Sequence, residues 1–292
     1  MQKIFIKNQL NDLKGLLKGI NPCRIFLVRG DRSYALSGAN TFICDLLGSD
    51  DFTSFYDFKT NPQLEDLERG LALFQKGRYE LIVAIGGGSV LDMAKLVSVF
   101  ASQPTGVEDA VKGKIPLKGI KIPLLAIPTT AGSGAEATQF AVLYIGKVKY
   151  SVEHPLVLPD YVYLSPDFTF SAGPYQTACT GLDAFCQAVE SVWSVNSNPE
   201  SEGYALRAIE LVWNNLKAAV SEGDQRARES MQEAAYLAGR AINITKTTAP
   251  HALSYAFTSY YGIPHGHAVA LSLPFFIRFN YSLTDNSCTD PR

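Results

Sequence analysis

The sequence predicts an α/β domain built on a parallel sheet, followed by an all-α helical domain. Short β-rich runs alternate with amphipathic segments in the first half, which is typical of parallel βαβ units. After about Ser165 the strand-like runs stop, and apolar residues recur at spacings of three and four, as in helices. Turn-forming sequences cluster near Asp167. We therefore expect a first domain at residues 1–167 and a second at 168–292.

The β-rich runs of the first half are the expected strands of the sheet. They are residues 24–28, 51–58, 81–85, 124–127 and 161–164. Residues 63–75 and 89–101 lie between them and have the apolar spacing of helices. Residues 140–152 instead form two extended runs around Gly146, which predicts a β-hairpin appended to the sheet.

Long helical patterns fill the second half. They cover residues 181–193, 200–220 and 226–242. His251 is expected at the start of a further helix, with Tyr255 one turn on along the same face. His265 lies between Pro264 and a glycine, so we place it in a turn that leads into a last helix near His267.

Composition limits the classes of function. The chain has 292 residues, 47% of them hydrophobic, which is enough for two domains with buried cores. A formal net charge of −2 argues against nucleic acid or an anionic membrane as the main partner. No apolar stretch reaches the roughly 20 residues of a membrane span. The five cysteines, Cys23, Cys44, Cys179, Cys186 and Cys288, are scattered and predict reduced, mostly buried thiols in a cytoplasmic protein.

Three of the four histidines lie within residues 246–274. They are His251, His265 and His267. Histidine titrates near neutrality and binds metals, so this concentration favours metal ligation or proton transfer. The alternative is that these side chains cap helices or satisfy local carbonyl groups.

Two loops rich in small residues follow expected strands. IGGGSVLDMAK begins at Ile85 and passes from a buried strand through glycines into a helix, a geometry that brings backbone N–H groups to a phosphate. Asp92 in this helix could orient a ribose or amide group. The alternative is that it is an acid near the start of the helix, where the helix dipole favours negative charge. IPTTAGSGAEAT begins at Ile127 and puts a second polar loop at the same sheet edge, where ligands of open α/β sheets bind.

A third motif, TGLDAFCQAVE from Thr180, places Asp183 and Gln187 on one side of a helix. Both could face solvent. With His251 and His265 from later helices, however, they complete a plausible set of oxygen and nitrogen ligands for a divalent metal.

These motifs resemble the iron-containing (group III) alcohol dehydrogenases. GGGSVLDMAK, AIPTTAGSGAEAT, TGLDAFCQAVE and HALSYAFTSYYGIPHGHA occur in that family's order, and the resemblance covers essentially the whole chain. It implies a Rossmann-like N-terminal domain, a helical metal-binding domain that is incomplete at its C-terminus, and hydride transfer between NAD or NADP and a small alcohol or aldehyde. The expected metal is Fe²⁺, with Zn²⁺ as the alternative.

The resemblance also implies the site residues. Gly30, Asn61, Gly87, Gly88, Ser89, Asp92, Thr129, Thr130, Ser133 and Lys149 are the expected cofactor-binding residues, and Asp183, Gln187, His251 and His265 are the expected metal ligands. Gln187 replaces the histidine usual in the family, and its amide oxygen is a weaker ligand than imidazole.

Two further side chains are catalytic candidates. Tyr255 stands where many members carry a histidine, and could transfer a proton or simply pack. His267 could serve as a substitute ligand or a proton shuttle, whereas His154 is expected to be structural.

The turn after the first predicted strand bears on cofactor choice. Gly30 occupies the position where NAD-preferring relatives carry aspartate, and Arg29 and Arg32 lie beside it. A 2′-phosphate would fit there, so NADP would fit, and Asp31 next to it leaves NAD open.

The sequence around Lys246, Thr247 and Thr248 looks most like that of family members that reduce phosphonoacetaldehyde. These side chains could bind a phosphonate. A short-chain alcohol or aldehyde is the broader expectation, and a homodimer is the expected assembly. Two alternatives stay open: a dehydroquinate-synthase-like lyase or cyclase that uses NAD and a metal, and a degenerate protein that binds dinucleotide without turnover.

Overall fold

The computed structural model describes residues 2–48, 52–103 and 106–284. The described chain divides into two compact units. The first holds the described residues up to Thr130 together with Ala135–Ser171, and the second holds Ala131–Gly134 and the described residues from Ala172 onward.

A six-stranded sheet of order β1-β8-β5-β4-β2-β3 forms the centre of the first unit, and all neighbouring strands are parallel. The strands are β1 (Lys3–Ile6), β2 (Ile25–Arg29), β3 (Phe52–Phe55), β4 (Leu81–Gly86), β5 (Leu124–Pro128) and β8 (Tyr161–Leu164). The predicted α/β fold is confirmed. The sequence did not predict β1, a four-residue edge strand with largely exposed side chains.

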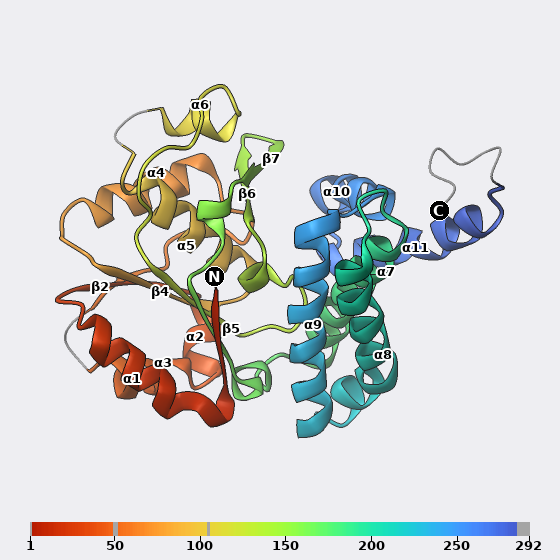
Figure 1. Ribbon diagram of the computed structural model, residues 1–292, viewed down its shortest axis with the longest axis horizontal. Helices are drawn as coiled ribbons and strands as arrows, with labels where there is room; N and C mark the ends of the chain where they lie inside the picture. Colours follow the sequence, from red (N-terminus) through yellow and green to blue (C-terminus); the bar gives the residue numbers. More distant parts are fainter. Residues whose placement is uncertain (1, 49–51, 104–105, 285–292) are drawn as a thin grey trace. The chain divides into compact units, whose positions relative to one another are not determined.

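Helices cover both faces of this sheet (Figure 1). One face carries α1 (Leu10–Ile20), α2 (Arg32–Leu36) and α3 (Ala39–Leu47), and the other carries α4 (Leu64–Phe74), α5 (Gly88–Phe100) and α6 (Val107–Val111). Alternate residues of β2 explain the two layers: Phe26 and Val28 enter one hydrophobic core, and Ile25 and Leu27 enter the other. Short 3₁₀ helices cover Lys7–Gln9, Ala135–Ala137, Pro155–Val157 and Pro166–Thr169.

The predicted hairpin forms, but not as an extension of the main sheet. β6 (Phe140–Ile145) and β7 (Val148–Glu153) pair antiparallel as a separate two-stranded sheet, and Gly146 turns between them with a φ of 61°. The expectation that it is appended to the sheet is therefore wrong. Ala141, Leu143 and Val152 pack in the hydrophobic core that contains α5, so side-chain burial rather than strand pairing holds the hairpin in place.

Five helices form the second unit within the described residues, as the sequence predicts. They are α7 (Pro174–Trp193), α8 (Pro199–Ser221), α9 (Gln225–Thr245), α10 (Ala249–Tyr261) and α11 (His265–Tyr281). The core between α7, α8 and α9 is rich in alanine, and small side chains allow helix axes to approach closely. Gly134 contacts α9 with a φ of 58°, and a Cβ there would lie 2.6 Å from the Cα of Gly239.

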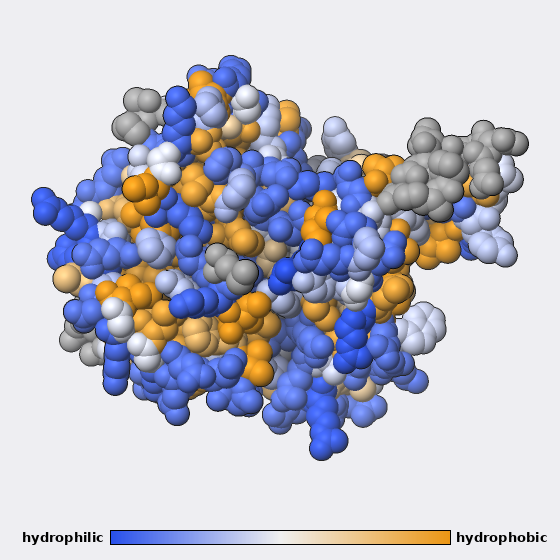
Figure 2. Space-filling model, viewed as in Figure 1, coloured by the Kyte–Doolittle hydropathy of each residue, from blue (hydrophilic) through white to orange (hydrophobic). Residues whose placement is uncertain are grey.

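The surface mixes charged and apolar residues. Hydrophilic residues surround smaller hydrophobic patches on the face shown in Figure 2. Exposed apolar side chains are most frequent on α11: Leu271, Phe275, Ile277, Phe279 and Tyr281. None of the described helices has the length and hydropathy needed to cross a bilayer. Cys179 and Cys186 are buried free thiols, whereas Cys23 is exposed, Cys44 is half-buried and Cys288 lies outside the described residues.

Candidate metal centre and dinucleotide loops

One face of α7 carries polar side chains into the interior of the helical unit. Asp183, Gln187 and Glu190 follow one another at spacings of four and three, so they line the same side of the helix. All three are buried, with Glu190 fully enclosed. Buried carboxylates need a compensating cation or hydrogen-bond donors, because desolvation of a carboxylate is costly. This face of α7 is therefore built to hold positive charge.

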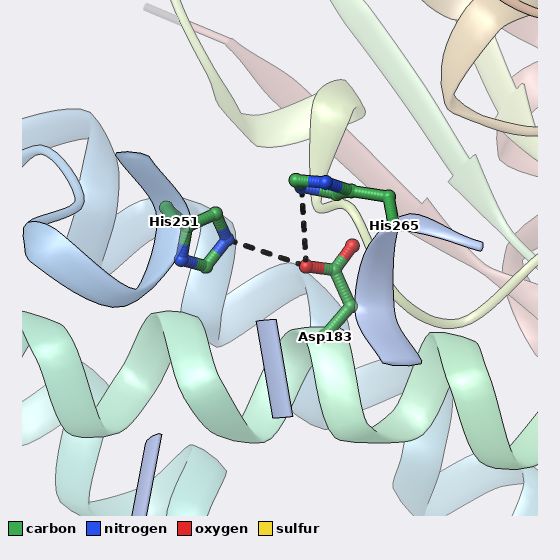
Figure 3. A group of neighbouring side chains, drawn as sticks. All are labelled: Asp183, His251 and His265. Carbon is green, nitrogen blue, oxygen red and sulfur yellow. Dashed lines mark ion pairs between the residues drawn. The ribbon is translucent and has the colours of Figure 1, made fainter. Parts of the chain in front are cut away.

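Two histidines meet Asp183 from later helices (Figure 3). His251 lies in the first turn of α10, with its Nε2 atom 3.4 Å from Asp183 Oδ1. His265 begins α11, with its Nε2 atom 3.9 Å from the same oxygen. One ligand atom from each of the three residues lies within 4.8 Å of the others. The structure thus brings together three of the four residues expected to bind metal at distances that one ion could span.

Close packing of α11 against α7 sets the position of His265. Gly266 lies directly against the backbone of Cys179: a Cβ added to the glycine would lie 2.0 Å from the Cys179 carbonyl oxygen and 2.9 Å from the Cβ of Asp183. Only glycine lets the first turn of α11 approach α7 this closely. The Pro-His-Gly sequence therefore brings an imidazole next to the aspartate.

Gln187, the fourth expected ligand, lies one turn from Asp183 in the same cluster. Its Nε2 atom is 3.4 Å from Asp183 Oδ1 and donates to the Ser133 carbonyl oxygen at 3.3 Å. Its Oε1 atom is buried and has no hydrogen-bond partner among the described residues. The Nε2 atom of His251 is likewise buried without a hydrogen-bond partner. Two orphaned buried atoms beside a carboxylate fit a site that receives a cation.

The charges around the cluster reinforce one another. Burial opposes ionisation of Asp183, but the charge of His265, the adjacent imidazole of His251 and a hydrogen bond from Gln187 keep its pKa below the ordinary value. Burial also opposes charge on His251, but its contacts with Asp183 and Glu190 raise its pKa to about 9. Without metal, the positive charge of protonated His251 therefore compensates the negative charges of Asp183 and Glu190. A divalent cation could supply this positive charge instead.

The cluster is enclosed on one side and open on another. Asp183 and His251 are buried, but 39% of the His265 side chain is exposed. Tyr255 is half-buried, and its ring stacks on that of His265 with centroids 6.1 Å apart and planes 12° apart. An open side next to a nearly complete ligand set is typical of catalytic rather than structural metal sites.

His267 lies outside the ligand cluster. Its Nδ1 atom is 3.0 Å from the Tyr175 hydroxyl group, and the two rings meet edge to face. The geometry does not support His267 as a substitute ligand. His154, expected to be structural, caps the 3₁₀ helix at Pro155–Val157 by accepting a hydrogen bond from the Leu156 backbone N–H.

The two polar loops share one edge of the parallel sheet. α5 begins at Gly88, immediately after β4, and the Thr129 backbone N–H donates to the Gly86 carbonyl oxygen at 2.9 Å. A Cβ on Gly87 would lie 3.5 Å from the Thr130 side chain. Ser89 is at the first turn of α5, and its hydroxyl group donates to the Thr60 carbonyl oxygen. The loops form a glycine-lined surface at a helix N-terminus, which suits a phosphate.

The other expected cofactor residues are more dispersed. Gly30 follows β2, and its N–H donates to the Ile85 carbonyl oxygen at 3.3 Å. Asn61 is exposed, and Lys149 pairs with Tyr144 in the register of the hairpin. Asp92 points into the unit, where its carboxylate accepts from the Val142 N–H at 3.1 Å and lies 3.8 Å from Lys95 Nζ. Ser133 belongs to the helical unit.

Sequence reasoning missed Glu190, the fully buried carboxylate that contacts His251. A glutamate on a helix is normally a surface residue, so the sequence alone did not predict that Glu190 belongs to the site. The signal was nonetheless present: Asp183, Gln187 and Glu190 place three long polar side chains on one face of a helix whose other buried residues are small.

Both halves of the chain match sequence families. Residues 2–166 match "Iron-containing alcohol dehydrogenase", and residues 177–290 match "Fe-containing alcohol dehydrogenase family, C-terminal". The chain belongs to the iron-containing alcohol dehydrogenase family.

Named members of this family are similar in sequence. Long-chain-alcohol dehydrogenase 1 of Geobacillus thermodenitrificans is 37% identical over 228 residues, 77% of this chain and 58% of that protein. Phosphonoacetaldehyde reductase of Streptomyces viridochromogenes is 38% identical over 224 residues, 74% of this chain and 57% of that protein. The matches to these two relatives thus span less than two thirds of their length.

A solved structure of the family is similar throughout the chain. Sulfoacetaldehyde reductase of Bifidobacterium kashiwanohense, in complex with NAD⁺, superposes with a TM-score of 0.89 at 31% identity. The match covers 96% of this chain and 75% of that one. This iron-containing alcohol dehydrogenase fold agrees with the parallel sheet and helical part described above.

Proposed function

We propose that this protein is a metal-dependent aldehyde reductase or alcohol dehydrogenase that uses a nicotinamide dinucleotide. The observation that carries the proposal is the convergence of Asp183, His251 and His265 from three helices, with the unpartnered Oε1 atom of Gln187 beside them. Family membership supports the same chemistry. In this proposal residues 1–167 bind the dinucleotide and residues 168–292 bind the metal.

Asp183, Gln187, His251 and His265 would hold the metal, with Fe²⁺ preferred and Zn²⁺ as the alternative. A divalent cation there would supply Lewis acidity that favours negative charge on a carbonyl oxygen. The carboxylate is held ionised by its neighbours, because its pKa is below the ordinary value. The half-exposed side at His265 leaves room for a small substrate.

The dinucleotide would bind at the two polar loops. Backbone N–H groups at the start of α5 would receive the pyrophosphate, and the glycines would let it approach. The remaining cofactor residues proposed are Gly30, Asn61, Ser89, Thr129, Thr130, Ser133 and Lys149. The bound nicotinamide would supply or accept the hydride. The NAD⁺ complex of the sulfoacetaldehyde reductase supports NAD as one cofactor.

NADP as the preferred cofactor rests on the end of β2. The Arg29 guanidinium lies 3.9 Å from the ring centroid of Tyr56 and 4.7 Å from that of Tyr34. When aromatic rings contact the faces of a guanidinium, the N–H groups at its edge can still donate to a phosphate. A lower KM for NADPH than for NADH, lost in Arg29→Ala, would support this preference.

Reduction of an aldehyde adds a hydride to carbon and a proton to oxygen. Tyr255 is the proposed proton donor, because it lies on the same helix as His251 and stacks on His265. His267 is a secondary candidate that could exchange protons through the Tyr175 hydroxyl group. Tyr255→Phe should lower kcat while leaving metal content unchanged.

Phosphonoacetaldehyde is the proposed substrate among small aldehydes. Two similar proteins are named for aldehydes that carry a phosphonate or a sulfonate. Lys246 is half-buried before the start of α10 and could pair with such an anion. Thr248 is less available than the sequence suggested, because its hydroxyl group donates to Glu190 and accepts from Trp193.

The deciding experiment combines metal analysis of the purified protein with NADH and NADPH assays. Phosphonoacetaldehyde and several uncharged aldehydes would be compared. His251→Ala and His265→Ala should lose both metal and turnover, whereas the control His154→Gln, which alters a helix cap, should keep both. Turnover that persists without metal would contradict the proposal.

The family matches do not favour the lyase, cyclase or non-catalytic alternatives, each of which predicts no net consumption of NAD(P)H. The homodimer stays a prediction that light scattering would test.

A further inference from the structure

Glu190 is a fully buried carboxylate with no place in the ligand set proposed above. Its Oε2 atom accepts hydrogen bonds from the Thr248 backbone N–H at 2.5 Å and from the Thr248 hydroxyl group at 2.9 Å. Its Oε1 atom contacts the Nδ1 atom of His251. Each carboxylate oxygen therefore has its own partner in the segment that begins α10.

Thr248 is the residue that precedes α10, and its hydroxyl group also accepts from the indole N–H of Trp193 at 2.8 Å. Trp193 and Glu190 both belong to α7. Thus the last turn of α7 holds the start of α10 through two side chains. Because His251 lies in the first turn of α10, the same contacts fix the backbone from which its imidazole projects.

The imidazole of His251 lies between two carboxylates. Nδ1 faces Glu190, and Nε2 faces Asp183 at 3.4 Å. A neutral imidazole carries one N–H group and one lone pair. A cation in the cluster would replace the proton at Nε2. Glu190, which can only accept, would then hold the remaining N–H group at Nδ1 and leave the lone pair at Nε2. That lone pair points toward the cluster of Asp183, Gln187 and His265.

We propose that Glu190 is a positioning residue for metal binding, which holds the N–H group of His251 at Nδ1 and thereby presents Nε2 to the cation. The inference rests on the metal site proposed above. Carboxylates that hold a ligating histidine in this way orient the ring and raise its basicity, and their loss typically lowers metal affinity by about 10- to 100-fold.

Glu190→Gln separates this role from simple support of the helix. Glutamine has the same size, and its amide oxygen can still accept from Thr248. Its NH₂ group would then face Nδ1 of His251 and favour the tautomer with the N–H group at Nε2, which cannot ligate. Thr248→Val is the matched control: it removes a hydroxyl group from the same carboxylate but leaves the contact with His251 unchanged.

The first measurement is Zn²⁺ affinity of the full chain by competition with a coloured chelator, with thermal unfolding of each metal-free variant. We expect Glu190→Gln to bind Zn²⁺ about 10- to 100-fold more weakly than wild type, and Thr248→Val to stay close to wild type. Equal affinity of Glu190→Gln and wild type would overturn this inference alone, as would an equal loss in both variants. Failure of wild type to bind Zn²⁺ would overturn the metal site as well.

A second measurement does not depend on Glu190→Gln. The chain has four histidines, so ¹⁵N-histidine labelling gives few ring signals, and His251→Gln identifies those of His251. In the Zn²⁺-loaded protein we expect a strongly deshielded N–H proton at Nδ1 of His251, with Nε2 as the ligand. An unprotonated Nδ1, or ligation through it, would overturn the inference even if Glu190→Gln did not fold.

Discussion

Lys95 and Thr138 tie together the segments that follow the two polar loops. The Nζ atom of Lys95 donates to Thr138 Oγ1 at 2.9 Å, although the lysine side chain is fully buried. Lys95 belongs to α5, which begins at the glycine loop, and Thr138 follows the second loop. The same ammonium group donates to the Phe140 carbonyl oxygen at 2.9 Å. One buried cation therefore links the backbone on both sides of the proposed phosphate site.

Replacement of this cation should weaken dinucleotide binding without loss of metal. Lys95→Met leaves the buried Asp92 without the counter-charge of Lys95, and breaking such a buried pair costs about 3 kcal/mol. We expect a lower urea midpoint by circular dichroism, a higher Kd for NADH and unchanged Zn²⁺ affinity. The exposed Lys76→Met is the control. Unchanged NADH affinity in a destabilised variant would show that Lys95 serves stability alone.

Glu136 should make stability depend on pH. Burial raises its pKa from 4.5 to about 7 in the folded protein. Between pH 4.5 and 7 the folded state holds a proton that the unfolded state releases, so the free energy of unfolding falls as pH rises, by at most about 3 kcal/mol. Urea titrations at several pH values should show this fall in wild type and its absence in Glu136→Gln. Parallel curves for the two proteins would argue against a buried, protonated Glu136.

Gln187→His should strengthen metal binding. Imidazole is a better ligand than an amide oxygen for Fe²⁺ or Zn²⁺, and the buried position next to Asp183 is already occupied by a side chain of similar size. We expect affinity to rise by about tenfold, or ~1.4 kcal/mol, in chelator competition. Gln176→His adds a histidine at an exposed position of α7 and should have no such effect. A lower affinity in Gln187→His would mean that the amide is not near the ion.

Gly266→Ala should separate the two histidines of the site. The added methyl group would collide with the Cys179 carbonyl oxygen, push α11 from α7 and move His265 away from Asp183. We expect weaker Zn²⁺ binding and a loss of stability of about 1–3 kcal/mol. Gly203→Ala, in α8 with open space around it, should instead be neutral or slightly stabilising. Full metal affinity in Gly266→Ala would show that α11 tolerates the shift.

Much of the fold could be predicted because its signals are local. The continuous apolar run at Leu81–Gly86 is typical of a strand buried on both faces. The alternation of such runs with helical segments predicts a parallel sheet. β1 could not be predicted, since its four residues are largely exposed and pair with β8 far along the chain. The separate hairpin depends on side-chain packing against α5, which no local pattern reveals.

The candidate site was predictable to a similar depth. The chain has four histidines, and three of them lie within residues 246–274, which predicted that His251 and His265 belong to the site. The structure brings these two side chains together with Asp183. The direction in which a side chain points could not be predicted from the sequence. Asp92 turns inward to Lys95, and His267 pairs with Tyr175, because neighbours distant in sequence supply their partners. Glu190 was missed because a glutamate on a helix is normally a surface residue, although its spacing from Asp183 and Gln187 puts it on their face of α7.

The hydrogen bond from Trp193 to Thr248 makes the fluorescence of Trp193 a reporter of the start of α10. Trp193 is linked through Thr248 and Glu190 to His251, whereas Trp213, the other tryptophan of the chain, is 79% exposed. In Trp213→Phe, the remaining indole emission would report directly on the start of α10. Filling of the site could then be followed in real time, without any added dye, by the intensity and wavelength of emission from a single half-buried tryptophan.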